Sequence, residues 1–311
     1  MTQENKPSIL DGIEMGIGTW SWGDRLFWGF GDGYAEKDCE EAFHESVNSG
    51  IVLFDTAEVY GQGKSELMLG KLLKQSNQTL KIASKIMPFP YRVLKSSLRN
   101  ALKHSLKRLG LEKIDLYQMH WPLPPLNVTR WMDRMAEVYE EGLISAIGVS
   151  NYNLEQTRAA HEQLKKHGLR LTSNQVEYHL LERRIETNGL MEYCREEGIT
   201  IIAYSPLAMG MLTGKYTPEN PPRGVRASQY NRAYLEKIQP LINSLARIGN
   251  DNNGKTAGQV ALNWLICKAV IPIPGVKNLI QATQNLGALG WKLKPDDVAF
   301  LDDLSLKVTR D

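Results

Sequence analysis

The stretch IVLFDTAEVYGQGKSELMLGKLLKQSNQTLKIASK, residues 51–85, contains two short apolar runs separated by an amphipathic segment. The runs at 51–55 and 80–85 have the length and composition of buried strands. Between them, residues 65–74 repeat their apolar side chains at intervals of three and four, which is the helical period. A strand, a helix and a second strand in this order form one unit of a parallel sheet. The stretch therefore predicts an α/β fold.

The same alternation continues along the rest of the chain. Eight segments have the pattern of short strands: EMGIGTW (14–20), IVLFD (51–55), LKIASK (80–85), IDLYQMH (114–120), LISAIGVS (143–150), LTSNQVEY (171–178), ITIIAYS (199–205) and AVIPIPG (269–275). Helical periodicity covers 37–48, 65–74, 93–108, 130–141, 154–167, 188–197 and 256–268. Eight alternations favour a (β/α)8 TIM barrel. An open dinucleotide-binding sheet is disfavoured, because the first strand lacks GxGxxG spacing. We assign residues 1–311 to a single barrel domain.

Two features exceed a minimal barrel. The irregular stretch 206–231, after the seventh strand, is rich in Gly, Pro and Arg. Loops of this length in compact domains are usually functional or disordered, so we expect a flap over a bound ligand. Extra helices are expected at 232–248 and 295–306. The prediction is a barrel with two extra helices and a long loop after strand 7.

Composition limits the possible partners. The 37 Lys and Arg residues against 35 Asp and Glu leave a net charge of +2, which favours neither nucleic acid nor a membrane surface. The three cysteines have no CxxC spacing, so neither a disulfide framework nor a metal site is expected. The first residues are polar, and no run reaches the roughly 18 apolar residues of a membrane span. We expect a cytoplasmic protein with a small-molecule partner.

Four polar residues lie where strands end. Asp55 ends the second strand, Lys85 the third and His120 the fourth, and Tyr60 follows in the loop after the second. Active sites of TIM barrels form at the C-terminal ends of the strands. Tyr has a pKa of about 10, and a nearby Lys ammonium favours its ionised form. Asp55 could hold this ammonium, and His120 could donate to a carbonyl oxygen. Together they predict a proton donor.

These residues also carry a family resemblance. The segments DTAEVYGQGKSE, ASKI and YQMHWP place Asp55, Tyr60, Lys85 and His120 on the catalytic tetrad of the aldo-keto reductases, which the chain resembles from its first strand to its last helix. The resemblance implies reduction of an aldehyde or ketone by hydride transfer from NADPH, with Tyr60 as the proton donor. The IPIPG and NLGALGW segments resemble the plant-plastid and cyanobacterial branch of the family.

The resemblance also implies a cofactor site. In GVSNY, Ser150 and Asn151 would bond to the nicotinamide carboxamide, Gln175 would be its second contact, and Tyr204 would stack on the ring. The other expected cofactor residues are Thr19, Trp20, Asp55, Ser205, Pro206, Leu207, Gly210, Leu212, Gly275, Val276, Lys277, Gln281, Gln284 and Asn285.

The segment IPIPGVKNLIQATQN bears on the choice between NADP and NAD. The loop after strand eight and the following helix N-terminus commonly bind phosphate in barrels. Lys277 could pair with a 2′-phosphate, and the resemblance, more than this charge, favours NADP over NAD. Many NADP-dependent members carry Arg four residues after this Lys, whereas this chain has Gln281.

Aromatic residues near the strand ends indicate the substrate pocket. We expect it to be lined by Trp20, Trp22, Tyr60, His120 and Trp121. An aromatic and largely uncharged pocket suits aldehydes better than anionic sugars.

Two other functions remain open. One is a cofactor-binding regulatory subunit that resembles potassium-channel β subunits and turns over little. The other is a barrel glycoside hydrolase with Asp55 and Glu177 as its carboxylate pair. We expect the protein to be a monomer or a weak homo-oligomer, with no metal.

Overall fold

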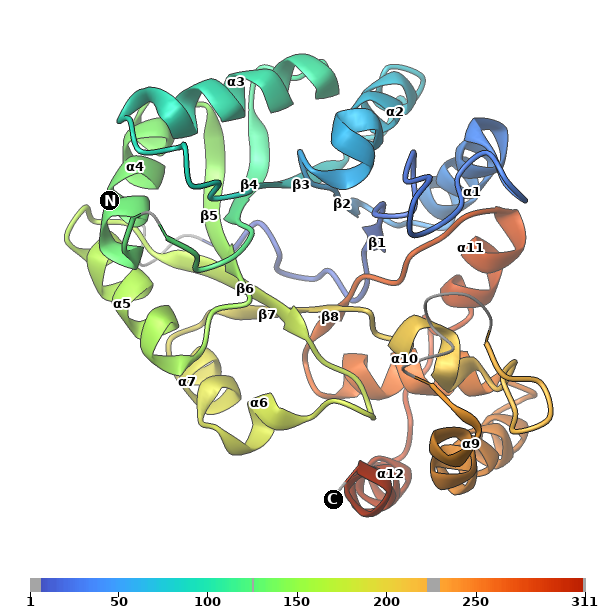
Figure 1. The fold of residues 1–311 in the computed structure, drawn as a ribbon. Coiled ribbons are helices and arrows are strands. Elements are labelled where there is room, and N and C mark those ends of the chain that lie inside the picture. Colours follow the sequence, from blue (N-terminus) through green and yellow to red (C-terminus); the bar gives the residue numbers. More distant parts are fainter. Residues whose placement is uncertain (1–6, 125, 223–229, 310–311) are drawn as a thin grey trace.

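The computed structural model describes residues 7–124, 126–222 and 230–309, and its centre is an eight-stranded sheet (Figure 1). Neighbouring strands pair in parallel, and their order in the sheet is their order in the chain. The strands are β1 (Ile17–Gly18), β2 (Leu53–Asp55), β3 (Lys81–Ile86), β4 (Ile114–Met119), β5 (Ile144–Ser150), β6 (Leu171–Glu177), β7 (Thr200–Tyr204) and β8 (Ile271–Pro272).

The sheet closes on itself between its first and last strands. The Gly16 and Gly18 amides donate to the carbonyls of Pro272 and Pro274 at 3.0 and 3.1 Å, and Gly18 forms a parallel bridge with Gly275. A Cβ at Gly18 would lie 2.9 Å from the Ile273 carbonyl oxygen, so this close approach needs glycine. The predicted (β/α)8 barrel is confirmed.

Helices surround the barrel (Figure 1). They are α1 (Glu36–Asn48), α2 (Lys64–Leu73), α3 (Ser96–Leu109), α4 (Val128–Glu140), α5 (Leu154–Lys165), α6 (Arg184–Thr187), α7 (Leu190–Glu196), α9 (Arg232–Asp251), α10 (Ala257–Cys267), α11 (Leu279–Leu286) and α12 (Pro295–Thr309). Most lie within a few residues of the predicted ranges. The helix predicted at 188–197 begins only at Leu190, because Gly189, with a left-handed φ of 82°, separates it from the short α6.

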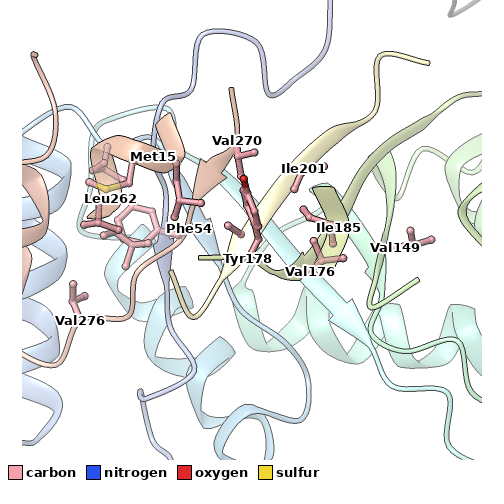
Figure 2. Close-up of a cluster of buried hydrophobic side chains, with 14 of the residues drawn as sticks. Met15, Phe54, Val149, Val176, Tyr178, Ile185, Ile201, Leu262, Val270 and Val276 are labelled. Carbon is pink, nitrogen blue, oxygen red and sulfur yellow. The ribbon is translucent and has the colours of Figure 1, made fainter. Parts of the chain in front are cut away.

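The alternation of side chains along each strand produces two apolar layers. Leu53, Ala83, Leu116, Ala146 and Ile202 point inward and pack together inside the barrel. Their neighbours in sequence point outward to the helices and form the larger cluster, part of which Figure 2 shows around Phe54, Val149 and Val176. Successive residues of a strand face opposite sides, so the next inward positions lie two residues further along.

The two predicted extra helices are α9 and α12, which pack together beside α10. The loop predicted to be irregular contains a short 3₁₀ helix, η3 (Ala208–Thr213), and its residues 223–229 lie outside the described part of the chain. In the part that is described, no helix combines the length and apolar character needed to cross a membrane.

Candidate active site

A cavity of about 1120 Å³ opens at the C-terminal ends of the strands. At its base is a polar layer two residues beyond the inner apolar layer. Asp55, which lines the cavity, follows Leu53, and Gln118, which lies beneath the lining, follows Leu116 at the same spacing. On β3, Lys85 likewise follows Ala83. The strand period therefore brings polar side chains from different strands to one level of the barrel.

Lys85 connects Asp55, Thr56 and Tyr60. It is fully buried, and its ammonium forms a salt bridge with Asp55. It also donates to the Thr56 carbonyl at 2.9 Å and to the Tyr60 hydroxyl oxygen at 3.1 Å. Tyr60 lies in η2 (Tyr60–Gly63), directly after β2. An ammonium has three N–H groups and no acceptor, so these three contacts use all of them.

The charges of this cluster follow from burial and contact. Burial raises the pKa of Tyr60, and the opposing effect of Lys85 is smaller. Burial alone would lower the pKa of Lys85, but the Asp55 carboxylate beside it brings the net shift upward. At neutral pH the site therefore holds a protonated phenol next to a charged ammonium. The sequence predicted the direction of the Lys85 effect but not that burial would exceed it.

His120 lies beside Tyr60, with the two rings edge to face and their centres 5.7 Å apart. Burial, and then the positive charge of Lys85, lower the pKa of His120 to about 3. Its imidazole is therefore neutral at physiological pH. Within the described residues, its Nδ1 is buried without a hydrogen-bond partner.

The ends of β4, β5 and β7 are joined through Asn151. Its amide donates to the His120 carbonyl at 3.1 Å and accepts from the Tyr204 hydroxyl at 2.9 Å. Asn151 and Ser205 have left-handed φ angles of 62° and 49°. Such strain in residues other than glycine is concentrated at functional sites, where the surrounding contacts maintain it.

The far end of the cavity lies at β8 and the N-terminus of α11. Asn278 caps this helix by accepting from the Gln281 amide, and the Gln281 side chain accepts from the Lys277 amide at 2.9 Å. The Lys277 ammonium donates to the Trp28 carbonyl and lies 4.5 Å from the centre of the Tyr34 ring. A helix N-terminus beside a Lys suits an anion such as a phosphate.

Most of the predicted site residues line the cavity. They are Trp20, Asp55, Tyr60, His120, Trp121, Ser150, Asn151, Gln175, Tyr204, Ser205, Pro206, Leu207, Gly210, Gly275, Lys277, Gln281, Gln284 and Asn285. Lys85 lies behind them, in contact with Asp55 and Tyr60.

Besides Lys85, four predicted residues lie outside the cavity lining. We expected Trp22 in the substrate pocket, but it is fully buried in the core. There its indole donates to the Val276 carbonyl at 2.9 Å. Val276 and Leu212 are also core residues. Thr19 is buried between the first two strands, where its hydroxyl donates to the Asp55 carbonyl at 2.9 Å.

Among the cavity residues that the prediction missed are Val59, Met87, Phe89, Met209, Thr213, Lys215 and Asn278. Met87 and Phe89 follow the C-terminal end of β3. This position in the sequence could have identified them as cavity residues. Met209, Thr213 and Lys215 belong to the long loop, whose irregular sequence does not indicate which side chains turn inward. Among the described residues, no group of three or more His, Cys, Asp or Glu could hold a metal ion.

Comparison with known proteins finds a matching family and similar oxidoreductases. A model of the aldo/keto reductase family matches residues 14–306. The chloroplastic pyridoxal reductase of Arabidopsis thaliana is 40% identical over 314 aligned residues, which cover 96% of this chain and 85% of the relative.

Solved structures agree in fold. A glycerol dehydrogenase from Gluconobacter oxydans superposes with a TM-score of 0.84 at 25% identity, covering 96% of this chain and 93% of that one. An aldo/keto reductase from Klebsiella pneumoniae, solved with NADP and acetate, has a TM-score of 0.72 at 26% identity, with coverages of 94% and 90%.

Proposed function

The chain belongs to the aldo/keto reductase family of oxidoreductases, and we propose that it reduces an aldehyde or ketone with NADPH, Tyr60 delivering the proton to the carbonyl oxygen. The observation that carries this proposal is the contact between Lys85 and Tyr60. Because Lys85 can only donate, the Tyr60 oxygen is the acceptor in this 3.1 Å bond. The phenol proton of Tyr60 is then available to a group in the cavity.

The neighbouring residues support this role. Asp55 holds the Lys85 ammonium in place, and this charge stabilises the phenolate that remains once the proton has left. Neutral His120 would orient the carbonyl oxygen by a hydrogen bond from its ring, without competing as the acid.

NADPH, when bound, supplies the hydride that reaches the carbonyl carbon. We propose that Ser150, Asn151 and Gln175 hold its carboxamide, and that Tyr204 packs against its ring. Lys277 and the α11 N-terminus would hold the 2′-phosphate, which favours NADPH over NADH. The NADP bound to the Klebsiella pneumoniae neighbour supports a nicotinamide dinucleotide in this cavity.

We further propose an aromatic aldehyde of no net charge as the substrate. Trp20, Phe89 and Trp121 line the cavity, and Trp20 stacks on Tyr60 with ring centres 6.1 Å apart. The name of the Arabidopsis thaliana relative makes pyridoxal the first aldehyde to test.

The hydrolase alternative conflicts with the surroundings of Asp55. One carboxylate oxygen pairs with Lys85, and the other accepts from both Gln118 and Gln175. A glycosidase carboxylate must act as acid, base or nucleophile, and an Asp bound in this way is poorly placed to do so.

Purified protein should oxidise NADPH when pyridoxal or another aromatic aldehyde is added, and NADH should be a poorer donor. Tyr60→Phe should lower kcat by roughly 100-fold or more, as expected for loss of a general acid, while NADPH binding is retained. The loss of absorbance at the dihydronicotinamide band measures turnover, and calorimetric titration measures NADPH binding. Unchanged turnover in Tyr60→Phe would remove Tyr60 from this role, and cofactor binding without turnover of any carbonyl would instead support a regulatory subunit.

A further inference from the structure

Gln118 is a buried polar residue to which neither the sequence pattern nor the proposed chemistry gives a role. It is fully buried on β4, beside Lys85 in the register of β3 and beside Gly148 in that of β5. Its amide lies under the cavity floor rather than in its lining.

Its hydrogen bonds fix which way the amide is turned. A carboxylate only accepts, so an amide that contacts it must present its nitrogen. Gln118 Nε2 donates to Asp55 Oδ2 at 3.1 Å. Its Oε1 therefore points away from Asp55, where it accepts from Gln175 Nε2 at 3.3 Å.

The same rule applies to Gln175. Its Nε2 donates to Asp55 Oδ2 at 2.8 Å as well as to Gln118, so both hydrogens of that nitrogen are used. Gln175 lines the cavity, and its Oε1 is the amide atom that remains for a ligand there. A ligand group that meets this oxygen must be a hydrogen-bond donor.

The barrel makes room for Gln118 at one neighbouring position. A Cβ on Gly148 would lie 2.8 Å from Gln118 Cγ and 2.6 Å from Ser173 Oγ. Any side chain at 148 would thus push Gln118 away from Asp55 and Gln175.

We infer that Gln118 is a positioning residue that holds the Gln175 amide with its oxygen toward the cavity, so that this oxygen reads the NH2 of the nicotinamide carboxamide. Without Gln118, one hydrogen of Gln175 Nε2 loses its acceptor, and only the bond to Asp55 is left to orient the amide. The inference rests on the proposed function, because it needs a nicotinamide dinucleotide in the cavity.

Calorimetric titration of the full chain with two ligands tests the inference. One is NADP⁺, and the other is its 3-acetylpyridine analogue, in which a methyl group replaces the carboxamide NH2. The wild type should prefer NADP⁺ by roughly 5-fold or more, the range of one net hydrogen bond. Gln118→Met, which keeps the length of the side chain but not its amide, should lose most of this preference through weaker NADP⁺ binding alone.

Ser173→Ala is the matched control. Ser173 is buried on the same strand as Gln175, and within the described residues its hydroxyl has no hydrogen-bond partner. This variant should keep the wild-type preference. If Gln118→Met does not fold, Gln118→Asn tests the same point, because its shorter amide cannot span from Asp55 to Gln175.

An unchanged preference in the Gln118 variant would overturn the inference, and so would an equal loss of affinity for both ligands. A wild type that binds neither dinucleotide would instead contradict the proposed function.

Discussion

At the scale of single residues, the neutral state of His120 has a consequence for stability. Burial and Lys85 lower its pKa from an ordinary value of 6.5 to about 3 in the folded protein. In the unfolded chain the imidazole becomes protonated below about 6.5. The unfolded state therefore binds more protons between these two values, and the folded state loses stability as the pH falls through this window.

His120→Gln should make stability less sensitive to acid. Each pH unit in the window costs the wild type up to about 1.4 kcal/mol through this residue, and the variant lacks this contribution. Urea unfolding of both proteins at pH 7, 6 and 5 would measure the difference. His161, whose pKa burial also lowers, contributes equally to both proteins. If the free energy of unfolding changed with pH in the same way for both proteins, folding would not lower the pKa of His120.

How far single residues could be predicted depended on where they lie along a strand. Asp55, Lys85 and His120 were identified because strand ends in a barrel converge on one rim. Gln118 has the same orientation as His120, two residues before it, yet inside the run IDLYQMH it looks like part of a buried strand. Its role depends on contacts with Asp55 and Gln175, from two other strands, which no local pattern encodes.

At the scale of elements, the loop after β3 is held by an ion pair beneath the cavity rim. The Glu58 carboxylate pairs with Arg92 and accepts from the Met87 amide at 2.7 Å, while Arg92 donates to the Met87 carbonyl at 2.8 Å. Met87 and Phe89, which this loop carries, line the cavity. The pair therefore connects the segment before Tyr60 to one wall of the site.

Arg92→Ala should destabilise the protein far more than the matched change Arg99→Ala. The side chains of Arg92 and Glu58 are 13% and 8% exposed, against 44% and 33% for Arg99 and Glu141. Removing one partner of a buried pair costs about 3 kcal/mol or more, whereas an exposed pair contributes less than about 1 kcal/mol. Urea unfolding at pH 7 compares the variants, and similar losses for both would mean that Glu58 is not desolvated.

Elements with strong periodicity were predictable, and those determined by glycine or by long-range contacts were not. The predicted helix 37–48 corresponds to α1 because its apolar face follows a regular period. The 3₁₀ helix η3 contains Met209 and Gly210 at φ angles of 53° and 95°, a conformation that packing selects rather than local preference. Trp22 was misplaced for a similar reason, since its partner Val276 lies at the opposite end of the chain.

At the scale of the whole molecule, the barrel closes between its two shortest strands. Both β1 and β8 have two residues, and the Gly16 and Gly18 amides supply the bonds between them. The cavity reaches both sides of this seam, because Gly18 and Gly275 belong to its lining. A ligand that occupies this end of the cavity would therefore contact β1 and the segment after β8 at once.

NADPH should accordingly stabilise the closed barrel and not only the loops over the cavity. At 100 times its Kd, a ligand that binds only the folded state raises the free energy of unfolding by about 2.7 kcal/mol. Hydrogen exchange of the Gly16 and Gly18 amides should slow with added NADPH, because opening the seam would break the bound site. The amides of α3, on the outer surface away from the cavity, serve as the reference. Their exchange rates report local opening that does not involve the ligand. Stabilisation without slower exchange at Gly16 and Gly18 would mean that the seam opens while the ligand stays bound, and that the cofactor is held by β5 to β7 and η3 alone.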